Sequence, residues 1–440
     1  MKTMKKSNFK KISILLLLVI FSAGYIKGQN INKTYNWKYN LSGDARVSMA
    51  NYDCNLAIHT WDKGEAELRL TIEAEPKSAE DGEVLDKYLK DLTFSSAPSS
   101  ASFSSRFWES RNTSWNRTTM KLRDGKNVSL KSFTIKGELW IPVNCMFTLD
   151  SKYSRISLED FSGPLILNLY NDNLTGGTVL SAVEITDKYS TIEFRDLKDC
   201  RVNLYNSKLT AGNTGNFSIE SKYSGVSLAS SGDLKISSYN DKYEIPKTGD
   251  VTFAAKYSDL KTETSGEVGV DLYNSNLSMN EAKDVNIRSK YSEISFSKAG
   301  RCSVQESYND KLTFGKLTSL TVSTSKYTTF SVDYLSEYVK ESDGYNDNFS
   351  ISGTGKEFSG FSLNGKYLDA DAVILKGTSY KFRADVKYPD LHIDESALKD
   401  VVRTIDGSSM KYDAVKGTES EGMPVIEITG YQIALRITEK

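Results

Sequence analysis

Apolar and polar residues alternate in short runs along most of the chain, and the runs recur in nearly the same form. In VNIRSKYSEISFSKAGRCSVQESYNDKLTF (285–314), apolar side chains occupy every second position on either side of small polar clusters that contain a tyrosine. Alternation with a period of two is typical of strands with one buried face. The pattern therefore predicts pairs of short strands joined at polar corners.

The tyrosine corners have two forms, Lys-Tyr and Tyr-Asn, which alternate along the chain. The second residues of successive corners lie 17 to 19 residues apart between 153 and 346, and looser corners follow at 367 and 388. The candidate structural ladder consists of Lys152, Tyr153, Tyr170, Asn171, Lys188, Tyr189, Tyr205, Asn206, Lys222, Tyr223, Tyr239, Asn240, Lys256, Tyr257, Tyr273, Asn274, Lys290, Tyr291, Tyr308, Asn309, Lys326 and Tyr327.

A period of this length predicts a solenoid. Seventeen residues can form two five-residue strands and two turns, and such a unit buries its apolar face only when it is stacked on neighbours. We expect an all-β fold, a β-solenoid (β-helix) of about 14 rungs of 17–18 residues. We expect the corner residues to serve this stack rather than a ligand.

Two geometries are compatible with the alternation. If each unit is one rung, one corner column reads Lys, Tyr, Lys and the next reads Tyr, Asn, Tyr, with each lysine against a tyrosine face. If two units make one rung, Lys-Tyr and Tyr-Asn form uniform ladders on opposite corners. We favour the first geometry, although the sequence is compatible with both.

The chain divides into four predicted regions. Residues 1–28 have five early lysines followed by the apolar run ISILLLLVIF, the pattern of a signal peptide. Residues 29–150 form an N-terminal β/α cap with one helix over 78–94, capped by Ser78, and a serine-rich insertion over 95–119. Residues 151–393 are the repeat array. Residues 394–440 form a C-terminal cap with a helix over 394–402 and a hairpin over 422–440.

Charge and cysteine content narrow the functional classes. Removal of residues 1–28 removes six lysines and changes the net charge from −1 to −7, which disfavours nucleic-acid binding. No second apolar segment is long enough to cross a membrane. Cys54, Cys145, Cys200 and Cys302 lack metal-site spacing; either Cys54 and Cys145 pair, or all four are isolated thiols. We expect no cofactor and no metal.

The array resembles a bacterial family of exported, adhesin-like domains of unknown function over residues 40–440. The resemblance rests on NLAIHTWDKGEAEL (55–68), the helix, GELWIPVN (137–144) and the tyrosine-centred units. It departs from the family's usual corners, which carry Tyr-Gly or Ser-Gly-Asp where this chain has Tyr-Ser or Asn-Asp. The resemblance implies a β-helical fold, an adhesive or envelope role and no catalytic residues.

Two functional hypotheses follow. The first is a non-catalytic exported protein of the periplasm, cell envelope or cell surface, an adhesin or interaction scaffold with an unknown protein or glycan partner, and monomeric. The alternative is a carbohydrate-active enzyme or glycan-binding protein on a β-helix. The uniform middle units and the wide separation of His59 and His392, the two histidines, favour the first. We expect the protein not to be an enzyme.

Overall fold

The computed structural model describes residues 30–115 and 117–440, so the predicted signal segment lies outside the described residues. The chain is nearly all β, with about 70% strand and 4% helix, and its strands stack into a β-solenoid of about 13 turns. This confirms the predicted fold class. None of the described helices is both long and apolar enough to cross a bilayer.

The chain folds as two compact units. The smaller combines the described residues up to 32 with 73–91 and 108–133, and the larger combines 33–72, 92–107 and 134–440. The smaller unit contains the helix α1 (Ala79–Asp91) and the hairpin strands β7 (Trp108–Ser114) and β8 (Arg117–Leu122). Three strands contribute to both units: β1 (Ile31–Asn40), β4 (Glu65–Pro76) and β9 (Asn127–Pro142).

Local sequence explains the smaller unit. The Ser78 hydroxyl accepts a hydrogen bond from the Asp81 amide at 3.1 Å, which caps α1 as the sequence predicts, and Leu85 and Leu89 are fully buried. The serine-rich segment 95–119 is largely strand rather than an irregular insertion. Its Trp108 is buried, whereas Trp115 is fully exposed.

In the larger unit each rung contains two strands separated by a tyrosine corner. The first strands are β2 (Arg46–Tyr52), β10 (Met146–Lys152), β12 (Leu165–Tyr170), β14 (Val183–Lys188), β16 (Cys200–Tyr205), β18 (Phe217–Lys222), β20 (Leu234–Tyr239), β22 (Val251–Lys256), β24 (Val268–Tyr273) and β26 (Val285–Lys290). The second strands are β3 (Asn55–Trp61), β11 (Arg155–Leu158), β13 (Asn173–Val179), β15 (Thr191–Leu197), β17 (Lys208–Asn213), β19 (Gly225–Ser230), β21 (Lys242–Glu244), β23 (Asp259–Thr264) and β25 (Asn276–Glu281).

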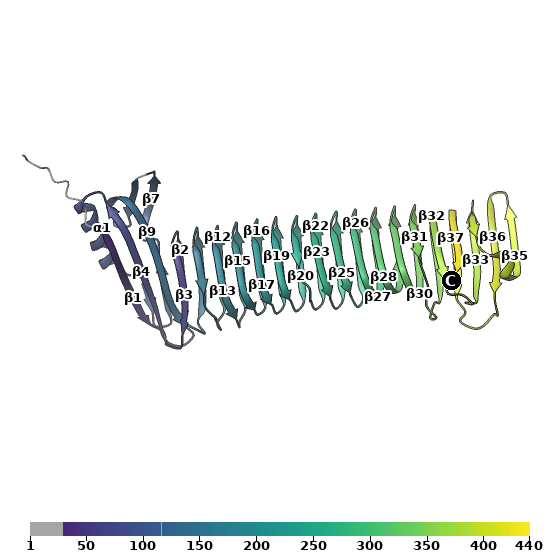
Figure 1. Cartoon of the computed structure of the whole chain (residues 1–440), viewed down its shortest axis with the longest axis horizontal. Coiled ribbons are helices and arrows are strands. Elements are labelled where there is room, and N and C mark those ends of the chain that lie inside the picture. Colours follow the sequence, from purple (N-terminus) through teal and green to yellow (C-terminus); the bar gives the residue numbers. More distant parts are fainter. Residues whose placement is uncertain (1–29, 116) are drawn as a thin grey trace, which may run out of the picture. The chain divides into compact units, whose positions relative to one another are not determined.

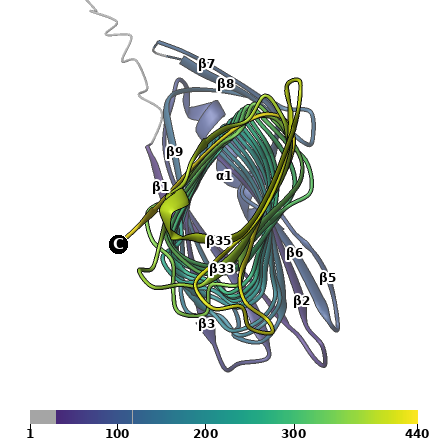
Figure 2. The same cartoon turned by 90° about the vertical axis from the view of Figure 1, so that its right-hand side faces the viewer.

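Later strands are longer because several continue through a turn into the next rung. They are β27 (Glu293–Tyr308), β28 (Lys311–Val322), β29 (Ser325–Lys326), β30 (Thr329–Tyr345), β31 (Asn348–Ile351) and β32 (Gly360–Ile374). Two short strands, β5 (Ser95–Ala97) and β6 (Ser100–Ser104), continue the stack ahead of β2, with which β6 pairs in parallel. Figure 1 shows the strands of the array following one another in chain order, and the end-on view in Figure 2 shows their coils superimposed.

The strand register shows that one repeat unit is one rung. β22 pairs in parallel with β24 so that Lys256 lies beside Tyr273, and β24 pairs with β26 so that Tyr273 lies beside Lys290. The favoured geometry is therefore confirmed. The array also begins earlier than residue 151, because Tyr52 of β2 pairs with Lys152 of β10.

Alternate side chains of the stacked strands of the array fill the interior, as in Val183–Lys188 and Val251–Lys256. Phe217, Phe253, Phe314, Phe330 and Phe349 are among the largest fully buried side chains, each supplied by a different rung. All four cysteines are free and buried, in apolar positions of the interior. Cys54 and Cys145 therefore do not pair, and all four cysteines are isolated thiols. Burial raises the pKa of Cys54, Cys145 and Cys200 to about 12.

The C-terminal end differs from the predicted helix and hairpin. A 3-10 turn, η1 (Glu395–Ala397), replaces the helix, because the following residues pair as a strand with their neighbour. The strands of this end are β33 (Tyr380–Lys387), β34 (Asp390–His392), β35 (Leu398–Asp406), β36 (Ser409–Lys416) and β37 (Val425–Glu439). The hairpin prediction was wrong because residues 425–439 form one strand.

Strand β37 is inserted out of chain order. It pairs in parallel with β32 on one side and with β33 and β34 on the other, so that Tyr431 lies between Lys366 and Lys387. The corner residues fit this insertion once the strand order is known. Two Lys-Tyr corners follow each other at 367 and 388, and Tyr431-Gln432 supplies the Tyr-Asn-like rung that the alternation lacks there.

Candidate functional site

The tyrosine corner is the most regular surface feature of the larger unit. All predicted ladder residues lie on it in two adjacent columns, the first reading Lys, Tyr, Lys and the second Tyr, Asn, Tyr. We call this corner, from Tyr52 to Tyr388, the tyrosine edge. Its construction depends on backbone conformation, ring packing and a buried polar row.

Every residue of the second column has a left-handed backbone. Tyr257 has φ of 57° and Asn274 has φ of 48°, and the other rungs are alike. Asparagine adopts this conformation readily, whereas for tyrosine it is uncommon and costs about 1–2 kcal/mol. The amide of Tyr257 donates to the Tyr273 carbonyl of the next rung at 3.0 Å. The stacked backbone thus fixes the corner.

Each rung contributes one tyrosine ring, alternately from the first and the second column. The result is an unbroken zigzag of 16 rings from Tyr52 to Tyr388, with centroids 5.3–5.8 Å apart and planes at 70–84°. This is the edge-to-face arrangement that aromatic rings prefer. Alternation of the two corner forms places successive rings edge to face.

The sequence predicted that each lysine of the ladder lies against a tyrosine face, but most of these lysines do not. Lys152 lies 5.9 Å from the Tyr170 ring centroid and Lys387 lies 5.5 Å from that of Tyr388. Lys290 instead pairs with Glu306 at 2.7 Å. Contacts between rings take the place of the predicted contacts between cations and rings, because rings on neighbouring rungs are within reach of each other.

A buried polar row lies beneath the tyrosine edge. From Ser154 to Asp347, the residue after each corner is Ser, Asp or Thr, and its side chain is buried. The Ser258 hydroxyl accepts from the Asp241 amide at 3.0 Å and donates to the Lys256 carbonyl at 3.0 Å. Sequence reasoning missed this row, although the third corner position showed it: Ser154, Asp172, Ser190, Ser207, Ser224, Asp241, Ser258, Ser275, Ser292, Asp310, Thr328 and Asp347.

The aspartates of this row are acceptors at the centre of small networks. One oxygen of Asp310 accepts from the Ser289 and Ser307 hydroxyls at 2.8 and 2.7 Å, and the other accepts from the Ser292 amide at 2.7 Å. Burial nevertheless raises the pKa of Asp310, and raises that of Asp172 to about 6. These carboxylates are occupied inside the fold and do not face a ligand.

Two acidic side chains of the interior, Asp187 and Glu341, have buried oxygens without a hydrogen-bond partner among the described residues. Glu341 is fully buried; one of its oxygens contacts the Ser325 hydroxyl at 2.5 Å, and the other has no hydrogen-bond partner. Burial raises its pKa to about 8. Gly344 provides the room, since a Cβ there would lie 2.4 Å from a Glu341 oxygen.

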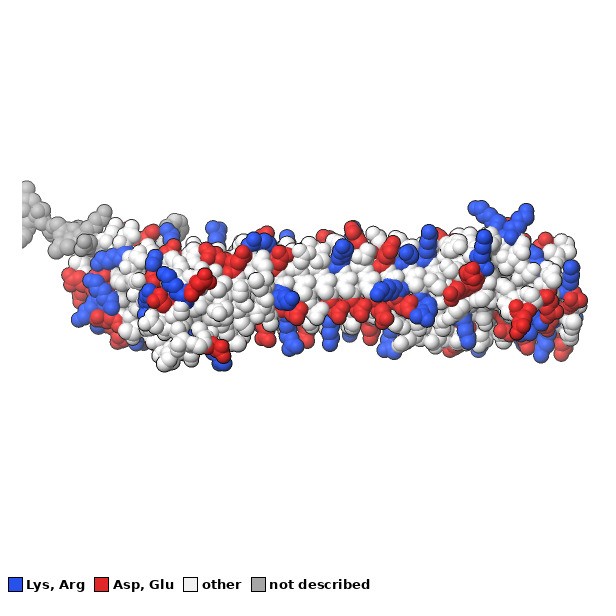
Figure 3. Space-filling view, turned by 90° about the horizontal axis from the view of Figure 1, so that it is seen from below, with Lys and Arg blue, Asp and Glu red and all other residues white. Residues whose placement is uncertain are grey.

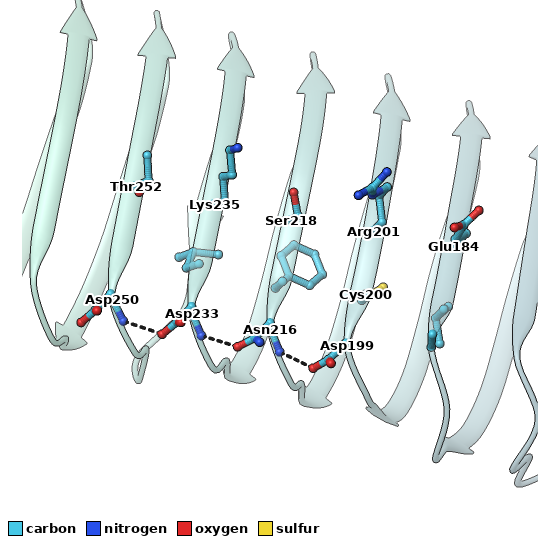
Figure 4. A pocket seen from close by; sticks show the side chains of 14 residues that line it. Glu184, Asp199, Cys200, Arg201, Asn216, Ser218, Asp233, Lys235, Asp250 and Thr252 are labelled. Atoms are coloured by element: carbon cyan, nitrogen blue, oxygen red, sulfur yellow. Dashed lines mark hydrogen bonds between the residues drawn. The ribbon is translucent and has the colours of Figure 1, made fainter.

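The opposite edge of the larger unit carries a second ladder. In successive turns, the amide of Asn216 donates to Asp199 at 2.9 Å, that of Asp233 to Asn216 at 3.0 Å, and that of Asp250 to Asp233 at 3.1 Å (Figure 4). A glycine in each turn leaves room for these side chains: a Cβ on Gly249 would lie 2.5 Å from the Asp233 oxygen. We call this edge the acidic edge.

A shallow hollow lies on the strand face above these turns. It has a volume of about 580 Å³ and is lined by Glu184, Arg201, Lys235 and Thr252 as well as the turn residues (Figure 4). It is the place where a carbohydrate-active enzyme would need a pair of free carboxylates. Its aspartates accept backbone amides instead. Among the described residues, no group of three His, Cys, Asp or Glu side chains could hold a metal ion.

The comparisons with known proteins add one structure. A solved structure of a proposed cell adhesion protein from Clostridium sporogenes aligns with 93% of this chain and 100% of its own length, at 10% identity and a TM-score of 0.18. That score is too low to support any statement about this chain. No model of a protein family matches the chain, and no curated protein matches it.

Proposed function

We propose that the chain is an exported, non-catalytic protein of the cell envelope or cell surface that acts as an adhesin or interaction scaffold through its tyrosine edge. The observation that carries this proposal is the exposure of the rings. Twelve tyrosines of the edge expose 37–51% of their surface although each is held by its neighbours.

Fixed aromatic rings are well suited to recognition. Tyrosine supplies a large amphipathic contact area, and a ring that is already ordered loses little conformational freedom on binding. Taking about 80–100 Å² for each exposed portion, the twelve rings offer about 1,000 Å², which exceeds the roughly 800 Å² that one partner buries in a standard interface. The tyrosine edge is therefore large enough for a stable contact.

The interior hydrogen bonds support a binding role rather than a catalytic one. Asp310 beneath the tyrosine edge and Asp233 beside the hollow accept hydrogen bonds from the rungs around them. An acid–base pair for glycoside cleavage has to be free to exchange protons with a substrate. The hollow keeps glycan binding or cleavage as the second candidate, because Glu184, Arg201 and Lys235 line it.

Adhesion measurements test the proposal. Beads coated with the exported chain should adhere to surfaces from a panel of neutral polysaccharides, acidic polysaccharides and the protein itself. We expect a variant with Tyr205→Ser, Tyr239→Ser and Tyr273→Ser to lose most of this adhesion. These three first-column residues are chosen because none of them has a left-handed backbone. Tyr334→Ser is the matched control, since Tyr334 is 43% exposed but belongs to the acidic edge.

Three results would contradict the proposal. Unchanged adhesion of the triple variant would exclude the tyrosine edge, and release of sugars from any polysaccharide would favour the enzymatic alternative. Export has a separate test, N-terminal sequencing of the secreted protein, for which we expect a start between residues 25 and 29. Retention of ISILLLLVIF in the mature chain would remove the argument for export.

A further inference from the structure

The two long edges of the larger unit carry opposite charge. On the tyrosine edge, Lys188, Lys222 and Lys256 recur on every second rung, each exposed and without an ion-pair partner among the described residues. Lys208 and Lys242 lie on the neighbouring second strands. Lys242 pairs with Glu244 at 3.0 Å, whereas the other four lysines have no ion-pair partner in the described part of the chain, and together with the exposed rings they form one stripe.

The acidic edge offers the complementary stripe. Asp199, Asp233, Asp250, Glu263 and Glu267 are exposed, and within the described part of the chain no basic side chain pairs with them. Figure 3, which looks at the lower edge of Figure 1, shows acidic side chains in a row along the middle of the array. Lys198, Lys247 and Lys283 on the same edge reduce this negative charge without cancelling it, and Lys298 and Arg301 pair with Glu281 and Asp284.

The same rungs build both stripes, so the lysine spacing of two rungs is a whole multiple of the one-rung spacing of the acidic turns. The Lys-Tyr corners at Tyr223 and Tyr257 are 34 residues apart. The turns with Asp233 and Asp250 lie between these corners and belong to successive rungs. At about 4.8 Å per rung, a second copy laid alongside in a suitable register would bring lysines on alternate rungs opposite the carboxylates of Asp233, Asp250 and Glu267. No unrelated partner has this match built in.

We propose that the tyrosine edge of one copy binds the acidic edge of a second copy, with the two arrays side by side. The inference deepens the proposed function, since it names the partner of the same edge. Each copy keeps one free tyrosine edge and one free acidic edge, so the contact is heterologous and grows into an open layer. The chain remains monomeric in dilute solution and assembles where it is concentrated.

Charge-reversal variants of the full exported chain test this partner. One variant carries Lys188→Glu, Lys222→Glu and Lys256→Glu. The second carries Glu263→Lys, Glu267→Lys and Glu281→Lys, which spares the aspartates that accept backbone amides. The control carries Arg201→Glu, Lys235→Glu and Lys340→Glu, which make the same change of net charge on the strand face.

Sedimentation velocity over a range of protein concentrations provides the readout. We expect the native chain and the control to associate at low ionic strength and to dissociate near 1 M salt, where the Debye length falls to about 3 Å. Each edge variant alone should associate about tenfold more weakly or worse, and an equimolar mixture of the two should recover association. Recovery in the mixture identifies the two edges as partners.

Several outcomes overturn the inference. These are association of either edge variant at the native level, a mixture that stays monomeric although both variants are folded by circular dichroism, or a native chain that stays monomeric and binds soluble polygalacturonate through the same lysines. The last result would leave the proposed function intact with an acidic polysaccharide as partner. Loss of all adhesion in the tyrosine variant with unchanged self-association would instead separate the two proposals.

Discussion

The middle rungs and the C-terminal end solve the same stacking problem in different ways. Between 183 and 309, each rung lies beside the rungs that precede and follow it in the chain. At the C-terminal end, β37 returns from the end of the chain and fills the place between β32 and β33. Neighbours in sequence stabilise the middle, whereas one distant strand holds the end together.

The difference shows which parts of the array are independent. The stability of a solenoid is roughly a sum over neighbouring rungs, so a defect in the middle weakens two interfaces and leaves the others intact. A defect in β37 removes the contacts of three strands at once. The end is therefore less modular than the middle, and variants in the two regions should behave differently.

Removal of residues 425–440 should have the largest effect. It abolishes the parallel pairing along β32, β33 and β34, and we expect a loss of more than about 5 kcal/mol for the C-terminal end, beyond the range of ordinary substitutions. Limited proteolysis should cut rapidly within 380–416 while residues 183–309 remain protected. Equal protection of both regions would show that β33 can stack directly on β32.

Glu341→Gln should have the next largest effect, and it should depend on pH. Because burial raises the folded-state pKa of Glu341 from 4.5 to about 8, its favourable contribution is complete below pH 4.5 and is lost as pH rises through about 8. We expect the variant to be more stable than the native chain at pH 9 by on the order of a few kcal/mol. At pH 4 the two should differ little.

Urea unfolding at both pH values measures this difference. Asp310→Asn is the matched comparison in the middle, since Asp310 accepts hydrogen bonds on both oxygens and the substitution replaces an acceptor by a donor. It should destabilise at pH 9 and less at pH 4, because burial raises the pKa of Asp310 and the native side chain is then protonated to a larger extent. A Glu341→Gln variant with the same stability relative to the native chain at every pH would show that Glu341 does not titrate in this range.

Tyr257→Ala should cost more than Tyr388→Ala. Both residues have a left-handed backbone, with φ of 57° and 54°, so the strain of alanine is the same at the two sites. Tyr257 contacts the rings of Tyr239 and Tyr273, whereas Tyr388 contacts Tyr431 alone among the described ring pairs. We expect a difference of about 1 kcal/mol, the contribution of one aromatic pair.

Thermal unfolding of both variants beside the native chain measures that difference. The central variant should also broaden or split the transition, because the rungs on either side of it become less coupled. If neither variant changed the melting curve, the rings would not support the stack, and their role would be confined to binding.

Gly249→Ala should have the smallest of these effects. A Cβ at this position would lie 2.5 Å from the Asp233 oxygen that accepts the Asp250 amide, and relieving this overlap should cost about 1–2 kcal/mol. Gly225→Ala is the control, since a Cβ there meets no atom within 4 Å. Chemical denaturation should show the control unchanged or slightly stabilised; equal losses would mean that the turns on the acidic edge adapt freely.

The repeats of the middle could be predicted from the sequence because the residues of each unit indicate its strands and its corner. Alternation in Val285–Lys290 gives the buried face, and the corner spacing gives the rung. The Ser, Asp and Thr residues of the buried row recur at the third corner position of the sequence. Their hydrogen bonds could not be predicted, because only the strand register brings the Ser258 hydroxyl to the Asp241 amide. The insertion of β37 could not be predicted from local pattern, since Val425–Glu439 satisfies the same alternation in a hairpin or in a rung.

The alternation of ring direction has a consequence for how such a chain changes length in evolution. A duplication or loss of one unit would set two identical corners side by side, with lysine against lysine and parallel ring attachments. A duplication of two units, 34 residues from 223 to 257, would preserve every contact. The heritable module is therefore the pair of rungs, and homologous chains of different length should differ by multiples of that pair.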